Sequence, residues 1–425
     1  MTRVQNKHLD RTVMRFLLAL AICLIVLAFI VSSPAEILAG LSRINFGLCQ
    51  LFTDFVAVGG LGATLVNIAL VMLFELALFW VTKTTISGPH LSILLMTAGF
   101  AFFGTSLFNM IPIVLGVFLY ARLLKVPFNS LFLQAFMGSA IGPLVNQIAF
   151  GLGLIPPIGI PLGIFGGVLV GLVFPPLSSS FSQFHKGYNL YNIGFTAGII
   201  GLIAVAVLRM LKFQVETVSV FDTEHGLALF LLALAIFLSF LVFGLIVNRG
   251  NLRDYPNLLS NSGRSPSDFV ALFGMGLTLF NMGLMGLMSL AVLKIVGGPV
   301  NGPIIGTVLS VGGFAAMGKH PRNTLPVMAG ASLAALLHGD IHAARALVAI
   351  LFSTTLAPLS GEHGIFVGLL AGYLHLAVVS NVVFLHGGLN LYNNGFSGGF
   401  VAAFLAPLLE VARQIRGKTL TRKTP

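Results

Sequence analysis

Long apolar stretches separated by short polar segments dominate the chain. Runs such as Phe16–Ile30, Leu61–Val81, Leu227–Val247 and Gly364–Phe384 are long enough to cross the hydrocarbon core of a bilayer as helices. Charged residues gather between these runs, and the alternating pattern of outer-membrane strands does not occur. The pattern predicts an all-α, polytopic transmembrane helix bundle of about ten to twelve spans.

A polar, glycine-rich motif occurs twice between apolar segments. His185–Gly198 and His386–Gly399 are identical at nine of fourteen positions and share the sequence Asn-Leu-Tyr-Asn-x-Gly-Phe. Amides and phenols are costly inside a membrane unless they face one another, water or a solute. Two interpretations stay open: the motifs line a transport path, or their amides form interhelical hydrogen bonds that hold the bundle together.

Further matches indicate two internal repeats. Ser106–Met110 resembles Thr278–Met282 at an offset of 172 residues, whereas the polar motifs recur at an offset of 201. The difference predicts 29 extra residues, and one extra crossing or re-entrant helix, in the middle of the second repeat. The expected organisation is a leading region with two spans (1–89), repeat 1 (90–212), a connecting span with a basic loop (213–264), repeat 2 (265–413) and a basic tail (414–425).

Both repeats contain glycine-interrupted helices. Breaks are predicted at Phe103–Gly104 and Phe273–Gly274, where glycine relieves the steric cost of leaving the helix. Asn109 and Asn281 lie close behind these breaks in the sequence and are expected to bond the freed backbone groups. The bundle is therefore expected to contain broken or re-entrant helices of the kind found in transporters.

Composition and charge agree with a membrane protein. Hydrophobic residues make up 57% of the 425 residues and charged residues 8%, which is too little charge to cover a soluble domain. The net charge of +11 comes mainly from the two ends of the chain. Because basic residues favour the cytoplasmic side, the protein is expected in the inner membrane with both termini in the cytoplasm. No basic face with interleaved aromatics predicts nucleic-acid binding. The two cysteines predict neither a disulfide framework nor a metal cluster.

The second repeat holds most of the interior charge. His338, Asp340 and His342 have a spacing compatible with a metal site, but a turn at the membrane surface explains them equally simply. Lys319 and Arg322 precede a helix start and suggest an anion site, with a cytoplasmic basic loop as the alternative. Glu75 lies inside an apolar span, where a carboxylate is a functional candidate or a protonated interhelical partner.

The doubled Asn-Leu-Tyr-Asn-x-Gly-Phe motif and the polytopic layout resemble an uncharacterised bacterial family of inner-membrane proteins, a domain of unknown function. That resemblance covers nearly the whole chain and implies no substrate. A weaker resemblance to urea transporters rests on Asn323–Val327 and Tyr392–Gly395. The residue order departs from the urea-transporter motif and the first half lacks the Thr-Leu-Pro element, so no urea-site residue is assigned.

These features predict a transporter or channel for a small polar or ionic solute, with its path at the interface of the repeats. An intramembrane enzyme using the His/Asp/Glu cluster of repeat 2, or a structural or sensory protein, are the alternatives. No phosphate-binding loop is present, and no cofactor or catalytic residue is predicted. The expected partners are the solute, the lipid bilayer and a second copy of the chain. The expected path residues are Asn189, Tyr191, Asn192, Asn390, Tyr392, Asn393, Asn394, Asn109 and Asn281, and the coupling or gating residues are His185, His386, Glu75 and Glu362.

Overall fold

The computed structural model describes residues 3–215, 217 and 219–421, and its regular structure is almost entirely helical. One parallel bridge, β1 (Phe52–Thr53) to β2 (Ser219–Val220), is the strand pairing in this part of the chain. The helices of the first half are α1 (Arg3–Val31), α2 (Pro34–Asn45), α3 (Phe55–Gly59), α4 (Leu61–Val81), α5 (Gly88–Phe100), α6 (Leu107–Leu124), α7 (Phe132–Met137), α8 (Pro143–Phe150), α9 (Pro156–Phe184) and α10 (Asn192–Met210).

The second half repeats this order helix by helix, so that α1 corresponds to α11, α2 to α12, and so on to α10 and α20. These helices are α11 (Gly226–Val247), α12 (Tyr255–Ser260), α13 (Phe269–Phe273), α14 (Met275–Val296), α15 (Gly302–Gly313), α16 (Pro321–His338), α17 (Ala344–Phe352), α18 (Ala357–His363), α19 (Ile365–Val382) and α20 (Asn393–Thr421). Short 3-10 turns η2 (Gly138–Ile141) and η4 (Ser353–Leu356) separate α7 from α8 and α17 from α18.

Ten helices of the described chain are long and apolar enough to cross a membrane. The count rises to eleven if the segment Phe128–Ile141 and α8, which are bent by 46° relative to each other, form one broken span. The expectation of a polytopic helix bundle with about ten to twelve spans and broken helices is therefore confirmed.

The correspondence of the halves begins earlier than the sequence matches suggested. Asp54–Ala57 and Asp268–Ala271 share the sequence Asp-Phe-Val-Ala, 214 positions apart. Each aspartate caps the short helix that follows it: the side chain of Asp54 accepts from Val56 N at 2.9 Å, and that of Asp268 from Val270 N at 2.9 Å. At the same separation, Asn281 corresponds to Asn67 and not to Asn109.

The predicted 29-residue insertion in the second half is wrong, because it rested on pairing Asn109 with Asn281. The separation of equivalent residues is 215 at Pro143 and Pro358 and falls to 201 at His185 and His386. The first half therefore carries 14 more residues, and they lie between α8 and the end of α9, which has 29 residues against 18 in α19. Neither half gains a helix, and α1 and α11 each belong to a repeat.

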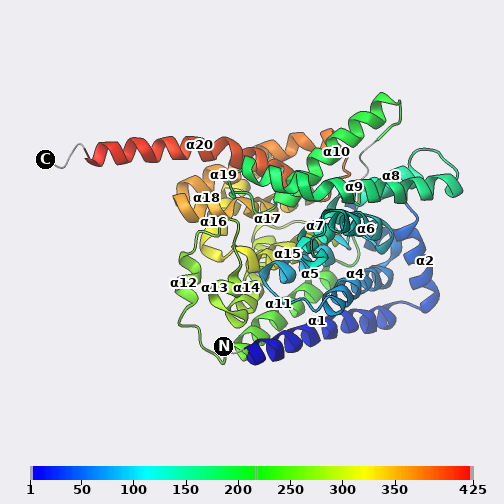
Figure 1. Ribbon diagram of the computed structural model, residues 1–425, viewed down its shortest axis with the longest axis horizontal. Coiled ribbons are helices and arrows are strands. Elements are labelled where there is room, and N and C mark those ends of the chain that lie inside the picture. Colours follow the sequence, from blue (N-terminus) through cyan, green and yellow to red (C-terminus); the bar gives the residue numbers. More distant parts are fainter. Residues whose placement is uncertain (1–2, 216, 218, 422–425) are drawn as a thin grey trace.

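The two halves have opposite orientations. α5 and α15 are antiparallel, since Ser92 near the start of α5 donates to Gly313 O at the end of α15 at 2.8 Å. Near the other end of α5, a Cβ added to Gly99 would lie 2.3 Å from Gly306 O, so glycine permits the close crossing. Figure 1 shows the same inversion: α2 and its counterpart α12 lie at opposite ends of the view. The start of α1 and the end of α20 both lie on the left of this view.

The helices pack as two bodies, each made from both repeats. The lower body in Figure 1 contains α1–α5 and α11–α15, with close packing of α1 on α4, α11 on α14 and α5 on α15. The upper body contains α6–α10 and α16–α20, with close packing of α6 on α9, α16 on α19 and α10 on α20. A seam between two such bodies is a place where an inverted-repeat membrane protein can hold a solute.

Candidate functional site

The two polar motifs meet in the interior of the bundle. The rings of Tyr191 and Tyr392 are fully buried, with centroids 4.2 Å apart and planes inclined by 31°. Gly194 and Gly395 let the chains cross, since a Cβ on Gly194 would lie 2.7 Å from Tyr392 O and one on Gly395 2.6 Å from Tyr191 O. α10 and α20 therefore begin at this crossing.

The first asparagine of each motif bonds the other repeat. Asn189 Nδ2 donates to Gly395 O at 2.9 Å, and Asn390 Nδ2 donates to Gly194 O at 3.1 Å. Their amide oxygens accept from Tyr191 N at 3.1 Å and Tyr392 N at 3.0 Å, respectively. Both amides thus form a reciprocal brace between the halves, which is what the interhelical hydrogen-bond interpretation expects.

The second asparagine of each motif pairs with the motif's histidine. His185 Nε2 lies 2.9 Å from Asn192 Oδ1, and His386 Nε2 lies 2.7 Å from Asn393 Oδ1. Burial lowers the pKa of His185, which lies in the loop between α9 and α10. In the second half only, Asn394 Oδ1 also lies 2.9 Å from Nε2 of His375 on α19.

Two pairs of asparagines hold the helix breaks. Asn109 Nδ2 donates to Gly104 O, and its counterpart Asn323 Nδ2 donates to Gly318 O, both at 2.8 Å. Asn67 Nδ2 reaches Ala101 O and Thr105 O at 2.9 Å each. Asn281 Nδ2 likewise reaches Ala315 O at 3.0 Å and Lys319 O at 2.8 Å. Asn281 therefore serves the break between α15 and α16, and not the turn at Gly274 to which the sequence had assigned it.

The Lys319 side chain is fully buried in this break. Its ammonium donates to the hydroxyl of Tyr191 and, at 2.8 Å, to Thr354 Oγ1 in η4. It also lies 4.0 Å from the centre of the Tyr191 ring. Across the described residues, no carboxylate forms an ion pair with it. The charge thus depends on hydroxyl groups and aromatic faces alone.

Arg322 and Glu75, two other charged residues among the predicted site residues, do not form a site with Lys319. Arg322 lies on the second residue of α16 and is exposed, so the expected Lys319–Arg322 anion site does not form. The reason is the helical turn at the start of α16, where Lys319 is directed inward and Arg322 outward. Glu75 is fully buried in α4, but it also forms no ion pair with Lys319.

The counterpart of Lys319 is Thr105, and the symmetry leaves polar atoms without partners. Thr105 Oγ1 and the Tyr392 hydroxyl are both buried and have no hydrogen-bond partner in the described part of the protein. By the pseudo-two-fold relation, Thr105 stands toward Tyr392 as Lys319 stands toward Tyr191. The short threonine side chain replaces the long lysine side chain at this position, so the Tyr392 hydroxyl lacks the bond that Tyr191 has. Buried hydroxyls without a partner are rare and therefore require an explanation.

A cavity of about 230 Å³ lies in the seam on the face of β1. Its outer part is lined by His338, Asp340 and Arg345, and its lining also includes Asn393 and Asn394 at the start of α20. Phe52 of the lower body closes one side, with the Arg345 guanidinium 5.2 Å from its ring centre. The cavity therefore connects charged surface residues with the beginning of the second motif.

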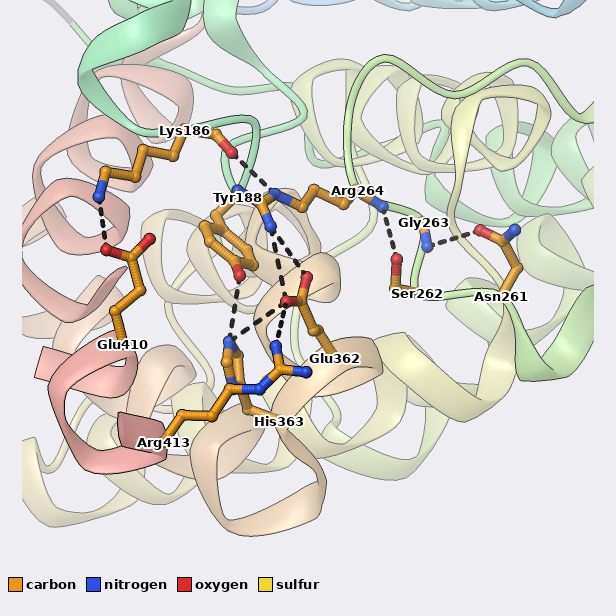
Figure 2. A network of polar contacts seen from close by, with 10 residues as sticks. All are labelled: Lys186, Tyr188, Asn261, Ser262, Gly263, Arg264, Glu362, His363, Glu410 and Arg413. Atoms are coloured by element: carbon orange, nitrogen blue, oxygen red, sulfur yellow. Dashed lines mark hydrogen bonds and ion pairs between the residues drawn. The ribbon is translucent and has the colours of Figure 1, made fainter. Parts of the chain in front are cut away.

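The seam on the opposite face is closed by ion pairs (Figure 2). Arg264, which precedes α13 in the lower body, donates to Glu362 Oε2 of α18 at 3.3 Å and to Lys186 O at 2.9 Å. Its guanidinium lies 4.1 Å from the centre of the Tyr188 ring. Burial, and next the Glu362 carboxylate, raises the pKa of Tyr188 to about 12, so the phenol stays neutral.

Further contacts extend this group, which we call the ion cluster. The Tyr188 hydroxyl lies 3.1 Å from His363 Nε2, and Arg413 of α20 lies 4.0 Å from Glu362. Lys186 and Glu410 pair at 2.7 Å at its edge (Figure 2). The positions equivalent to Arg264 and Glu362 in the first half are Gln50 and Gln147, so the seam near β1 lacks this charged pair.

The described residues of repeat 2 do not have the geometry of a metal site. In the described residues, no group of three or more His, Cys, Asp and Glu side chains is placed to hold a metal ion. His338 is the last residue of α16, Asp340 and His342 lie in the turn before α17, and all three are exposed. Four residues of the site were not predicted from the sequence: Asn67, Asn323, Arg264 and Thr354. The repeated Asp-Phe-Val-Ala sequence fixes the separation of equivalent residues at 214 and would have revealed Asn67 and Asn323.

Comparison with known proteins gives a family without an assigned role. The family described as "Protein of unknown function (DUF1576)" matches residues 33–210 and 247–411. The chain belongs to this family, and the two matched segments agree with the internal duplication. No curated protein and no solved structure matches the chain.

Proposed function

We propose that this member of the DUF1576 family is an integral membrane transporter for a small polar or ionic solute. The inverted repeats, the broken helices and the polar centre support the proposal, because this is the usual construction of carriers that bind a solute midway across the bilayer. In this proposal the lower and upper bodies move relative to each other and expose the centre first to one face and then to the other.

The observation that carries the proposal is the difference between the two ends of the seam. One end is bridged by Arg264 and Glu362, whereas the other carries Gln50 and Gln147 and a cavity that reaches Asn393. A pseudo-symmetric protein that is closed by charge at one face and hollow at the other has the form of one state of an alternating-access cycle.

The proposed path runs from the cavity to the crossing of the motifs. Asn393, Asn394, Tyr392, Tyr191 and Lys319 offer amide, phenol and ammonium groups along it. Asn189 and Asn390 act as braces of the crossing, and Glu362 acts in the gate at the opposite face. We place both termini, the ion cluster and the basic loops in the cytoplasm and the cavity at the outer face of the inner membrane.

Flux through purified protein in liposomes tests the function. Vesicles containing the protein are screened with radiolabelled neutral solutes, carboxylates and inorganic ions, and uptake is compared with protein-free vesicles. Arg264→Gln places at this position the residue found at the equivalent position 50. It is expected to change the rate of solute uptake at least about threefold, because it removes the ion pair with Glu362 that closes the gate.

Arg253→Gln is the matched control. It removes the same charge from an exposed residue between α11 and α12, whereas Arg264 lies between α12 and α13, and it leaves the ion cluster intact. Uptake that stays at the level of protein-free vesicles for every solute class would refute the proposal. Equal rates for Arg264→Gln, Arg253→Gln and the unchanged protein would refute the gating role.

A further inference from the structure

The Lys319 amine has no counter-charge among the residues that the structure describes. A charged lysine inside a bilayer is costly, and this one is fully buried, away from any surface to which it could extend. Its two side-chain partners are hydroxyl groups, which carry no negative charge when protonated. The protonated form of Lys319 therefore lacks a counter-charge, which a bound anion would supply.

The groups around Lys319 are able to donate hydrogen bonds. The Tyr191 and Thr354 hydroxyls can each rotate a hydrogen toward a ligand, and the buried hydroxyls of Tyr392 and Thr105 have no partner among the described residues. In the described part of the chain, no carboxylate, the usual ligand of a cation, forms an ion pair with Lys319. A cation would face an ammonium group here, whereas an anion would satisfy it.

Two helix starts add to the same preference. α10 begins at Asn192 and α20 at Asn393, each directly after one of the stacked tyrosines. The first turn of a helix has free N–H groups and the positive end of the helix dipole, so both starts favour negative charge at the crossing. The cavity lined by Asn393 and Asn394 reaches the start of α20 from the face where Arg345 and Asp340 line its outer part.

We propose that Lys319, with the hydroxyls of Tyr191, Tyr392 and Thr354, forms a binding site for a small singly charged anion of halide or carboxylate size. This site deepens the proposed function and rests on it, because it supplies the solute class of the transporter. The charge of one lysine matches one negative charge, and the close packing of the tyrosines excludes a large ligand. Binding would replace the hydroxyl partners of the ammonium by a charge-assisted hydrogen bond.

Binding is measured on purified protein in detergent, separately from flux. Chloride, nitrate, formate and acetate are added as sodium salts, with sodium sulfate at matched ionic strength, and the unfolding temperature is followed. We expect at least one monovalent anion to raise it, with an affinity that falls about tenfold or more in Lys319→Met, the loss that corresponds to one charge-assisted bond. Lys83→Met, which removes an exposed lysine just after α4, should leave the affinity unchanged.

Tyr191→Phe guards against a Lys319→Met variant that does not fold. It keeps the ring against Tyr392 and removes one hydroxyl, and it should weaken binding about fivefold. Three outcomes would each overturn the anion site. The first is an anion response in Tyr191→Phe or Lys319→Met that equals the response of the unchanged protein. The others are a response to sulfate alone and no response to any anion.

The flux assay separates this result from the function itself. Uptake of a neutral solute without any anion response means that the protein transports but the anion inference is wrong. An anion response that depends on Lys319, without uptake of any solute, means that the site exists and the transport proposal is wrong.

Discussion

Replacing Asn390 by alanine tests whether the crossing of the motifs is a brace. The side chain makes two hydrogen bonds, to Gly194 O at 3.1 Å and from Tyr392 N at 3.0 Å, and both ends of the amide are thereby used. The interpretation of the motifs as path-lining predicts that this substitution impairs transport more than folding. The contacts now predict a loss of stability as well, because the variant removes both bonds and leaves the buried Tyr392 N–H without its Asn390 partner.

The magnitude follows from the number of bonds. Hydrogen bonds between membrane helices contribute roughly 0.6–1.7 kcal/mol each, so the loss of two predicts a decrease of about 1–3 kcal/mol in the free energy of unfolding. Asn189→Ala should lose at least as much, since it removes the equivalent bonds at 2.9 and 3.1 Å and also the bond that the Asn189 amide oxygen accepts from Thr355 Oγ1. The double variant should fall short of the sum, because the braces act on the same crossing.

Unfolding in mixed micelles with increasing denaturing detergent measures these values. Asn381→Ala is the control: that asparagine is exposed on α19 and bonds only Ala377 O of its own helix, at 2.9 Å. A loss for Asn390→Ala that equals the loss for Asn381→Ala would refute the brace. Flux per folded molecule, measured on the same preparations, shows whether Asn390 also serves the path.

The remaining predictions concern the breaks, the crossing and the gate. Asn281→Ala and Asn67→Ala should each destabilise the protein by about 1–3 kcal/mol in the same unfolding assay, because each loses two bonds to a helix break; a large effect of one alone would contradict their equivalence. Gly395→Ala should cost about 1–3 kcal/mol, since its Cβ would lie 2.6 Å from Tyr191 O, and an unchanged unfolding midpoint would show that the crossing can shift. Glu362→Gln, which reproduces the residue at position 147, should increase the labelling rate of a cysteine introduced at Ser262 by opening the seam beside Arg264; labelling that stays constant would mean that the ion cluster does not close this face.

The sequence was sufficient for the class of fold and for the meeting of the two motifs. Apolar runs of spanning length and the near identity of the segments around Tyr191 and Tyr392 carry that information directly. The repeat boundaries were predicted wrongly, because Leu-Phe-Asn-Met occurs at two non-equivalent places and resembles a repeat. The aspartates at positions 54 and 268 hold the true register, but a single aspartate before a short helix is a weak signal when read alone.

The candidate site was predicted only in part. The motif residues are identifiable by polarity, yet polarity does not distinguish an amide that bonds backbone, such as Asn189, from one that lines a cavity, such as Asn394. Lys319 and Arg322 are three positions apart, and only the helix start decides that one is buried and the other exposed. The pairing of Arg264 with Glu362 joins residues far apart in sequence, which no local pattern reveals.

The aspartate caps also cross between the repeats. Asp54 accepts from Gly302 N at the start of α15 at 2.9 Å, and Asp268 accepts from Gly88 N at the start of α5 at 3.0 Å. Each half-helix is thus capped by the other repeat. A single-repeat ancestor could satisfy both caps only by pairing with an upside-down copy of itself, so the gene duplication would have fused two chains that inserted in both directions.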